Sequence, residues 1–343
     1  MKKMLMALLA AALLLCAGCA MADGWQTMPT VDSNGDITLK AGTPYQLPDG
    51  SDAAITGDVK IAPGAAVKLH LNGRTLTCSG VVVPEGATLE LIDSQEGTGK
   101  IVCSYNAWGV WIEEGSMTMD GGTITANGGS AAAVYVSGGG TFTLNKGTLS
   151  GTQEGVSNNG SFTMEGGTVT GKWGVRNHAT FMMEDGTVTG KAGDGVDNSG
   201  SFTMHGGTVE ATGSGGCGVT GGTFTMHGGH VKGVTNGVDT NGAFRISAGT
   251  IESKNGKSVT KVTEEHSVLP GSYVRRGAFE ENLVIVEKSP AAEPQLPGGT
   301  GMPGGGGAPD AGSLPQTGDA SMLGAWIALL GASAMGLRIR KRR

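Results

Sequence analysis

A short segment that alternates apolar and polar residues recurs about every 20 residues through the middle of the chain. The clearest copies are 161–169, 180–188 and 201–209, each with Phe at its second position. The steps between copies are 19 to 25 residues. A period of this length is typical of solenoids, in which each repeat buries its apolar face only against its neighbours. The last apolar residues of the nine copies are Leu76, Ile101, Ile124, Leu149, Val169, Val188, Val209, Val231 and Ile251.

The alternation with period two predicts half-buried strands rather than helices. In one copy, Phe181 and Met183 form a first strand and Val188 lies in a second, while the Gly174-Val175 pair starts a third. Three short strands per repeat describe one coil of a parallel β-helix. A leucine-rich repeat would show a Leu/Asn consensus and a helix, and a propeller needs about 40 residues per blade.

Glycine supports the same conclusion, because 63 of the 343 residues are glycine. A helical bundle is disfavoured by this content, since each helical Gly costs roughly 1 kcal/mol relative to Ala. Collagen is excluded because no strict Gly-X-Y period occurs.

Two features resemble right-handed parallel β-helix proteins of the pectate-lyase-like kind. Asn158, Asn177 and Asn198 share one column, like the asparagine ladder of these proteins, and residues 67–76 are similar to their opening coil. The resemblance implies an all-β domain over residues 23–288, a right-handed solenoid of about nine rungs. Proteins of this kind include polysaccharide lyases and hydrolases.

Residues 1–22 have the order of a secretory signal peptide, with a charged start, an apolar stretch and an Ala-Met-Ala cleavage site at 20–22. We therefore predict export and a mature chain that begins at Asp23. A lipoprotein signal, with Cys19 as the lipidated residue, is the alternative.

The C-terminal part divides into three segments. Residues 289–313 are rich in Pro, Gly and Ala and predict a flexible linker. A pentapeptide follows, and then an uncharged run over 320–337 ends in a basic tail. Eighteen helical residues span about 27 Å, near one hydrocarbon core, and the cations would hold the tail in the cytoplasm. The pentapeptide consists of Leu314, Pro315, Gln316, Thr317 and Gly318.

This order resembles the sorting signal of Gram-positive wall-anchored proteins, whose motif is Leu-Pro-x-Thr-Gly. The resemblance implies that a sortase cuts between Thr317 and Gly318 and joins Thr317 to peptidoglycan. We therefore expect a secreted protein, attached to the cell wall and facing outward. An uncut membrane helix is the alternative.

Processing would also change the charge of the chain. Removal of 1–22 and 318–343 takes away seven cations and one anion, which leaves 17 Lys and Arg against 29 Asp and Glu, a net charge of −12. A nucleic-acid-binding protein would need a basic surface, so nucleic acid is not an expected partner.

Four aromatic residues are candidates for ligand binding. When the Gly-Val strands are aligned, Trp111 and Tyr135 point outward on adjacent rungs, and Trp108 and Trp173 lie in turns that enter the same face. Sugars stack on such rings, and polar neighbours give specificity. The alternative is partial burial of the rings under inserted loops.

The sequence shows no convincing catalytic or metal site, and we expect no cofactor. Glu165 and Glu184 would lie about 5 Å apart, as in a retaining glycosidase. Adjacent rungs place any two equivalent residues at that distance, so the spacing carries no information. His205 and His227 continue the same column, where a turn accounts for polar residues.

Two cysteines form a candidate disulfide. Cys78 and Cys103 each lie two residues after the last apolar residue of their copies, so they share a column on adjacent rungs. The rung spacing of about 4.8 Å fits a disulfide, and export permits oxidation. Two reduced, buried thiols are the alternative. The sequence as a whole predicts an adhesin-like surface protein that binds a glycan or a host surface protein, and the alternative is a wall-anchored polysaccharide lyase or glycoside hydrolase.

Overall fold

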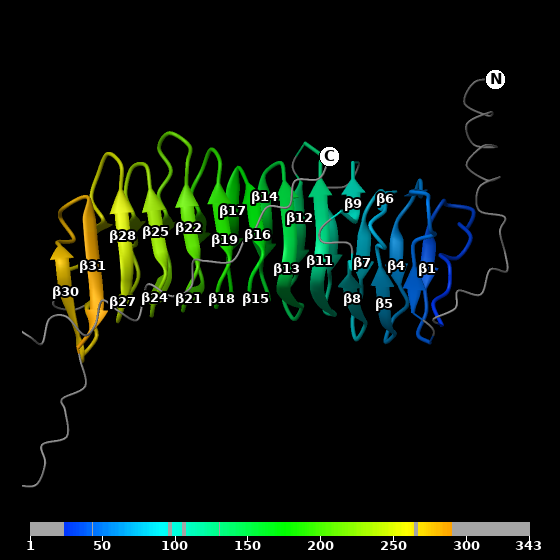
Figure 1. The fold of residues 1–343 in the computed structure, drawn as a ribbon, viewed down its shortest axis with the longest axis horizontal. Helices are drawn as coiled ribbons and strands as arrows, with labels where there is room; N and C mark the ends of the chain where they lie inside the picture. Colours follow the sequence, from blue (N-terminus) through cyan, green and yellow to red (C-terminus); the bar gives the residue numbers. More distant parts are fainter. Residues whose placement is uncertain are drawn as a thin grey trace, which may run out of the picture. The chain divides into compact units, whose positions relative to one another are not determined.

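The computed structural model describes residues 24–42, 44–94, 98–104, 108–129, 131–263 and 267–289. These residues form a right-handed parallel β-helix of ten turns, which confirms the fold expected from the repeat. Figure 1 shows the turns stacked side by side along one axis. Each complete turn contributes one strand, or half of a long strand, to each of three columns.

The strands of the first and second columns belong to one hydrogen-bonded system. The first column contains β2 (Tyr45–Gln46), β5 (Ala66–His70), β8 (Thr88–Ile92), the first parts of β11 (Ser116–Ala126) and β13 (Thr141–Gly151), β15 (Ser161–Met164), β18 (Thr180–Met183), β21 (Ser201–Met204), β24 (Thr223–Met226) and β27 (Phe244–Ile246). The second column contains β3 (Ala53–Ala54), β6 (Thr75–Cys78), β9 (Lys100–Cys103), the second parts of β11 and β13, β16 (Thr168–Gly171), β19 (Thr187–Gly190), β22 (Thr208–Ala211), β25 (His230–Gly233) and β28 (Gly249–Ser253).

The third column is a separate parallel sheet of eleven strands. Its members are β1 (Ile37–Leu39), β4 (Val59–Ile61), β7 (Val81–Val83), β10 (Trp108–Ile112), β12 (Ala132–Val136), β14 (Glu154–Asn158), β17 (Trp173–Asn177), β20 (Val196–Asn198), β23 (Val219–Thr220), β26 (Val238–Asp239) and β29 (Val259–Thr260). After β29 the chain forms a hairpin of β30 (Ser272–Gly277) and β31 (Leu283–Lys288), and β31 pairs antiparallel with β28. The hairpin thereby covers the open edge of the second column.

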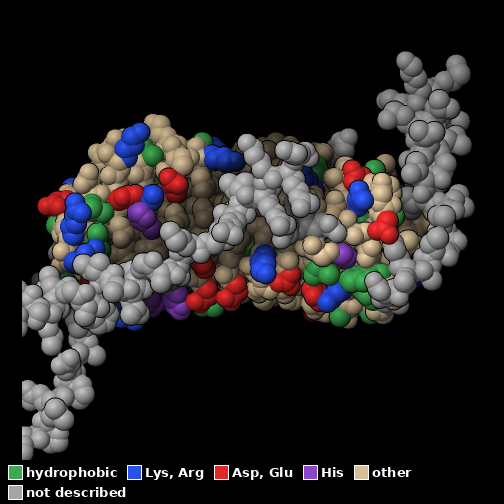
Figure 2. Space-filling view, in the orientation of Figure 1, with side chains coloured by type: hydrophobic (Ala, Val, Ile, Leu, Met, Phe, Trp, Pro, Cys, Tyr) green, Lys and Arg blue, Asp and Glu red, His purple; other side chains and the backbone are tan. Residues whose placement is uncertain are grey.

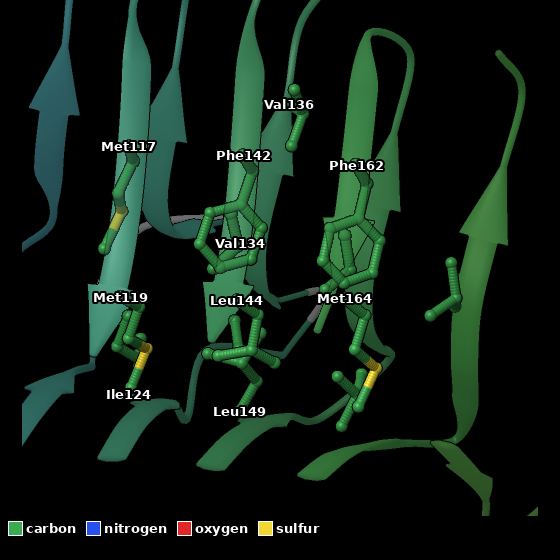
Figure 3. Packing of buried hydrophobic residues seen from close by; sticks show 14 of the residues in the cluster. Met117, Met119, Ile124, Val134, Val136, Phe142, Leu144, Leu149, Phe162 and Met164 are labelled. Atoms are coloured by element: carbon green, nitrogen blue, oxygen red, sulfur yellow. The ribbon is translucent and has the colours of Figure 1, made fainter. Parts of the chain in front are cut away.

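Inward side chains form ladders in the core, because equivalent residues of successive turns pair in register. Phe162 pairs with Phe181, which pairs with Phe202, and their ring centroids lie 4.7 and 4.6 Å apart. Figure 3 shows the start of this ladder, with Met117, Phe142 and Phe162 in one row. Stacking of flat rings at the strand spacing keeps the interior closely packed along the axis.

The glycines between the first and second columns have a geometric role. Gly207 has φ of 78°, in the left-handed region that favours glycine, and a Cβ there would lie 2.6 Å from the carbonyl oxygen of Gly186. Consecutive turns therefore bring backbone against backbone at this corner, which accounts for much of the glycine content.

The asparagine column is a buried ladder, as expected. Asn158 donates from Nδ2 to Oδ1 of Asn177 at 2.7 Å, and Asn177 donates to Oδ1 of Asn198 at 2.8 Å. The same amides also donate to backbone carbonyls of the turns, for example from Asn177 to Ser201. Each amide therefore satisfies backbone groups that would otherwise be buried without partners.

The tenth turn precedes the nine copies found in the sequence. It consists of β2, β3 and β4, and Ala53 occupies the position that Leu76 fills on the next turn. The repeat was missed here because alanine replaces the large apolar residue that marks every other copy.

Candidate functional site

The outward face of the third column holds the candidate aromatic residues. In β10 the burial pattern places Trp108 and Trp111 outward, and Gly109 and Val110 inward. Gly109 faces the interior at a crowded corner, where a Cβ would lie 2.6 Å from the carbonyl oxygen of Ala133. The same pattern recurs in β17, so Trp108 and Trp173 are first residues of strands rather than turn residues; in β12 and β14 the first position is buried and only Tyr135 and Ser157 are partly exposed.

Three of the four rings form one cluster, which we call the aromatic cluster: Trp108, Trp111 and Tyr135. Trp111 pairs in register with Tyr135. The rings of Trp108 and Tyr135 stack with centroids 4.9 Å apart and an interplanar angle of 24°, and Trp108 lies 5.3 Å from Trp111. All three side chains are half-buried, so each ring keeps part of its surface in solvent.

The polar edges of the cluster are fixed by hydrogen bonds. The indole Nε1–H of Trp111 donates to Ser137 Oγ at 2.8 Å, and Asn159 Nδ2 donates to the hydroxyl of Tyr135 at 3.2 Å. These bonds hold the rings in one orientation, which lowers the entropy lost when a ligand stacks on them.

Trp173 lies on the same face, but two turns beyond Tyr135, and the structure gives it other neighbours. The guanidinium carbon of Arg176 is 4.3 Å from the ring centroid, and Lys172 Nζ is 4.2 Å away. The indole ring of Trp173 therefore makes cation–π contacts with both side chains, and the attraction is electrostatic.

Arg176 is the centre of a charged triad. Its Nη1 is 2.7 Å from Oε1 of Glu154, and its Nε is 3.2 Å from Oδ2 of Asp197. Glu154 is only 9% exposed, so this carboxylate is held against the sheet. Arg176 and Asp197 share an outward column on adjacent turns, so the sequence predicts their surface ion pair, but it does not predict the part of Glu154. The sequence signal for Glu154 is its position directly before a Gly-Val pair, the position that Trp173 occupies on the next turn.

The Glu/His column lies at the turn between the first and second columns. His205 Nδ1 is 3.0 Å from Glu184 Oε2, and His227 Nδ1 is 2.9 Å from Ser247 Oγ. Figure 2 shows acidic and histidine side chains gathered along the lower border of the solenoid. Within the described residues, no group of three or more His, Cys, Asp or Glu side chains is arranged to hold a metal ion.

A groove of about 430 Å³ lies over β22, β25 and β28. Its outward side chains alternate in charge along the axis, because Glu210 pairs in register with Lys232 and Lys232 with Glu252. Oε1 of Glu252 lies 3.5 Å from Lys232 Nζ and 3.3 Å from His230 Nε2. Figure 2 shows this mixed group on the face toward the viewer. Mutual pairing of these charges accounts for the arrangement without a ligand.

Asp194 is a half-buried carboxyl that follows Trp173 in the same outward position. It accepts hydrogen bonds from the backbone N–H of Cys217 at 2.7 Å and from Thr220 Oγ1 at 3.2 Å. Burial, which outweighs these hydrogen bonds, raises the pKa of Asp194 above its ordinary value of 3.8.

This pKa shift predicts a pH-dependent effect of Asp194→Asn. A raised pKa means that the folded state binds the proton more tightly, so ionisation destabilises it. That destabilisation is absent below pH 3.8 and grows as the pH rises through the folded-state pKa. We expect the asparagine variant to gain stability relative to the wild type between acidic and neutral pH, measured by urea unfolding. Asp185→Asn, which removes an exposed carboxylate, is the control. A difference independent of pH would contradict the expectation.

The two candidate disulfide cysteines pair in register, as expected. Cys78 and Cys103 are buried thiols whose sulfur atoms are 3.6 Å apart. The contact with Cys103, together with burial, raises the pKa of Cys78 well above its ordinary value. A raised thiol pKa leaves little reactive thiolate at neutral pH. Formation of the disulfide stays a prediction.

The sorting signal, from Leu314 to the basic tail, and the signal peptide at 1–22 lie outside the described residues. Among the residues that are described, no helix has the length and apolar character needed to cross a membrane. No model of a known protein family, no curated protein sequence and no solved structure matches the chain.

Proposed function

We propose that this chain is a secreted glycan-binding protein of adhesin type, displayed on a β-helix and held at the wall of a Gram-positive bacterium. The observation that carries the binding proposal is the aromatic cluster. Trp108, Trp111 and Tyr135 lie together on the outward face of the third column and are only partly buried, and hydrogen bonds fix the polar edges of Trp111 and Tyr135.

Such a cluster suits the apolar face of a sugar ring. The C–H groups of a pyranose pack on an aromatic face, while polar groups at the rim bond to its hydroxyls. Ser137 and Asn159 stand at this rim. A protein surface could use the same rings, since aromatic side chains also anchor protein interfaces. The glycan is the ligand we favour, because the polar edges of Trp111 and Tyr135 already have hydrogen-bond partners and the ring surface left in solvent is apolar.

A glycan array with the full chain tests the proposal. We expect retention of a defined set of glycans, with no reducing sugar and no unsaturated product released from them. Cleavage of the retained glycans would favour the runner-up, a wall-anchored lyase or glycoside hydrolase. An array without any retained glycan would overturn the binding proposal.

Wall anchoring is proposed from the sorting signal alone and has its own test. In the producing bacterium, muramidase digestion of the wall should release the protein with Thr317 as its C-terminal residue, linked to peptidoglycan fragments. Thr317→Ala should shift the protein to the membrane or the medium, because sortase joins the wall through that threonine. Gln316→Ala is the matched control, since the motif accepts any residue there. Wall-bound protein that retains 318–343 would contradict the proposal.

A further inference from the structure

We infer that the ligand of this face is an unbranched, neutral glycan that runs along the solenoid axis from the aromatic cluster to Arg176. The inference rests on the proposed glycan binding and adds to it the direction, the length and the charge class of the ligand. It assigns Arg176 as a residue that determines specificity for chain length.

The register of the third column gives the direction. Trp111 pairs with Tyr135, Tyr135 with Ser157, and Ser157 with Arg176. These four outward residues therefore form one straight row along the axis, which we call the ligand row. At a strand spacing of about 4.8 Å, Trp111 and Arg176 lie roughly 14 Å apart along the axis.

The length of the row fits an oligosaccharide rather than a single sugar. A sugar unit of a linear chain advances by a distance comparable to the strand spacing, so the row matches about three or four units. Ser157 is a small residue between the rings and Arg176, and Glu154, on the same strand, is 9% exposed and paired with Arg176. A chain stacked on Tyr135 therefore meets only a small side chain within the ligand row before it reaches Arg176.

The far end of the row is built for hydrogen bonding. Arg176 is held by Glu154, by Asp197 and by the ring of Trp173, and its side chain remains 29% exposed. The guanidinium has five N–H donors, and the two ion pairs leave some of them for a ligand. A fixed donor group of this kind recognises sugar hydroxyls at a small entropic loss.

The charge of the triad selects against acidic sugars. Two carboxylates, Glu154 and Asp197, surround the Arg176 guanidinium. Lys172 on the Trp173 ring adds a cation and Asp194 on the next turn adds a carboxylate, so these five groups carry three formal negative charges against two positive ones. An incoming uronate would be repelled, whereas neutral hydroxyls can accept from Arg176 and donate to the carboxylates.

Calorimetric titration of the full chain with defined oligosaccharides tests the inference. The probes are β-1,4-linked chains of glucose, of mannose and of N-acetylglucosamine, from two to six units, and α-1,4-linked galacturonic acid chains of the same lengths. We expect affinity for at least one neutral series to rise up to about four units and then level off, and no binding of the acidic series.

Two variants locate the effect on the row. Arg176→Gln should weaken binding of the four-unit chain by about tenfold, as for loss of a charged hydrogen bond, and leave the two-unit chain unchanged. Ser157→Phe should block the path and remove the gain from the third and fourth units, while Glu154, Arg176 and Asp197 themselves stay unsubstituted. Thr163→Phe, on an outward face of the first column, is the control and should change neither value.

The outcomes separate this inference from the proposed function. Binding that does not depend on chain length, or that both row variants leave intact, would overturn the inference while the protein remains a glycan binder. Binding of the galacturonic acid chains, or of none of the four series, would also overturn it, and retention of other glycans on the array would still support the proposed function. An array that retains no glycan would overturn both the inference and the proposed function.

Discussion

Replacing Phe181 with alanine is expected to lower the free energy of unfolding by about 3–5 kcal/mol, as large-to-small changes of buried aromatic residues do. The ring is 1% exposed and stacks between Phe162 and Phe202, at 4.7 and 4.6 Å. Its loss removes contacts on two sides, and the parallel strands above and below limit how far the turns can collapse into the space. Urea unfolding followed by far-UV circular dichroism measures the effect.

The adjacent residue supplies a matched control. Met182 is a large apolar side chain in the same strand, but it points outward and is 36% exposed. Met182→Ala and Thr163→Ala should each change stability by about 0.5 kcal/mol or less. Equal losses at Phe181 and Met182 would contradict the alternation of inward and outward residues on which the fold rests.

Replacing both Trp111 and Tyr135 with alanine is expected to abolish glycan binding. Each stacked ring contributes on the order of 1–3 kcal/mol in comparable contacts with nucleic-acid bases, so loss of two rings lowers affinity by at least about thirtyfold. Both side chains point outward and are only partly buried, so the fold should remain intact. Binding of the glycans retained on the array, measured by calorimetry, gives the result.

Tyr273 provides the control for the aromatic change. It is 42% exposed and lies on β30, in the hairpin after the last turn rather than on the third column. Tyr273→Ala removes an exposed ring and should leave affinity unchanged. Full affinity after the double change, with an unaltered far-UV spectrum, would leave a glycan-binding protein but exclude the aromatic cluster as its site.

The fold was predictable from the sequence because each turn has the same types of residue at the same positions. Phe, Met and Val return at fixed offsets in each turn, and side chains that alternate with period two have only one face to bury. The ladder of Asn158, Asn177 and Asn198 was predictable for the same reason. The first turn was not, because Ala53 takes the place of a large apolar residue and its strands β2 and β3 have only two residues each.

The candidate site was predictable only in part. Register predicts that Trp111 and Tyr135 are neighbours, because both follow from counting along the third column. The hydrogen bonds that fix their edges and the cations over Trp173 depend on side-chain rotamers, which the spacing of residues does not specify. The ion pair between Glu154 and Arg176 could not be predicted either, because the position of a residue in a column gives the direction of its side chain but not the partner that the side chain contacts.

A crystal structure of the protein with an array-selected oligosaccharide would show directly whether the aromatic cluster binds a glycan. We expect a sugar ring stacked in van der Waals contact with Trp111 or Tyr135, and further units directed past Ser157 toward Arg176. An oligosaccharide bound elsewhere, for example in the groove between Glu210 and Glu252, with the three rings of the cluster uncovered, would contradict glycan binding at the aromatic cluster.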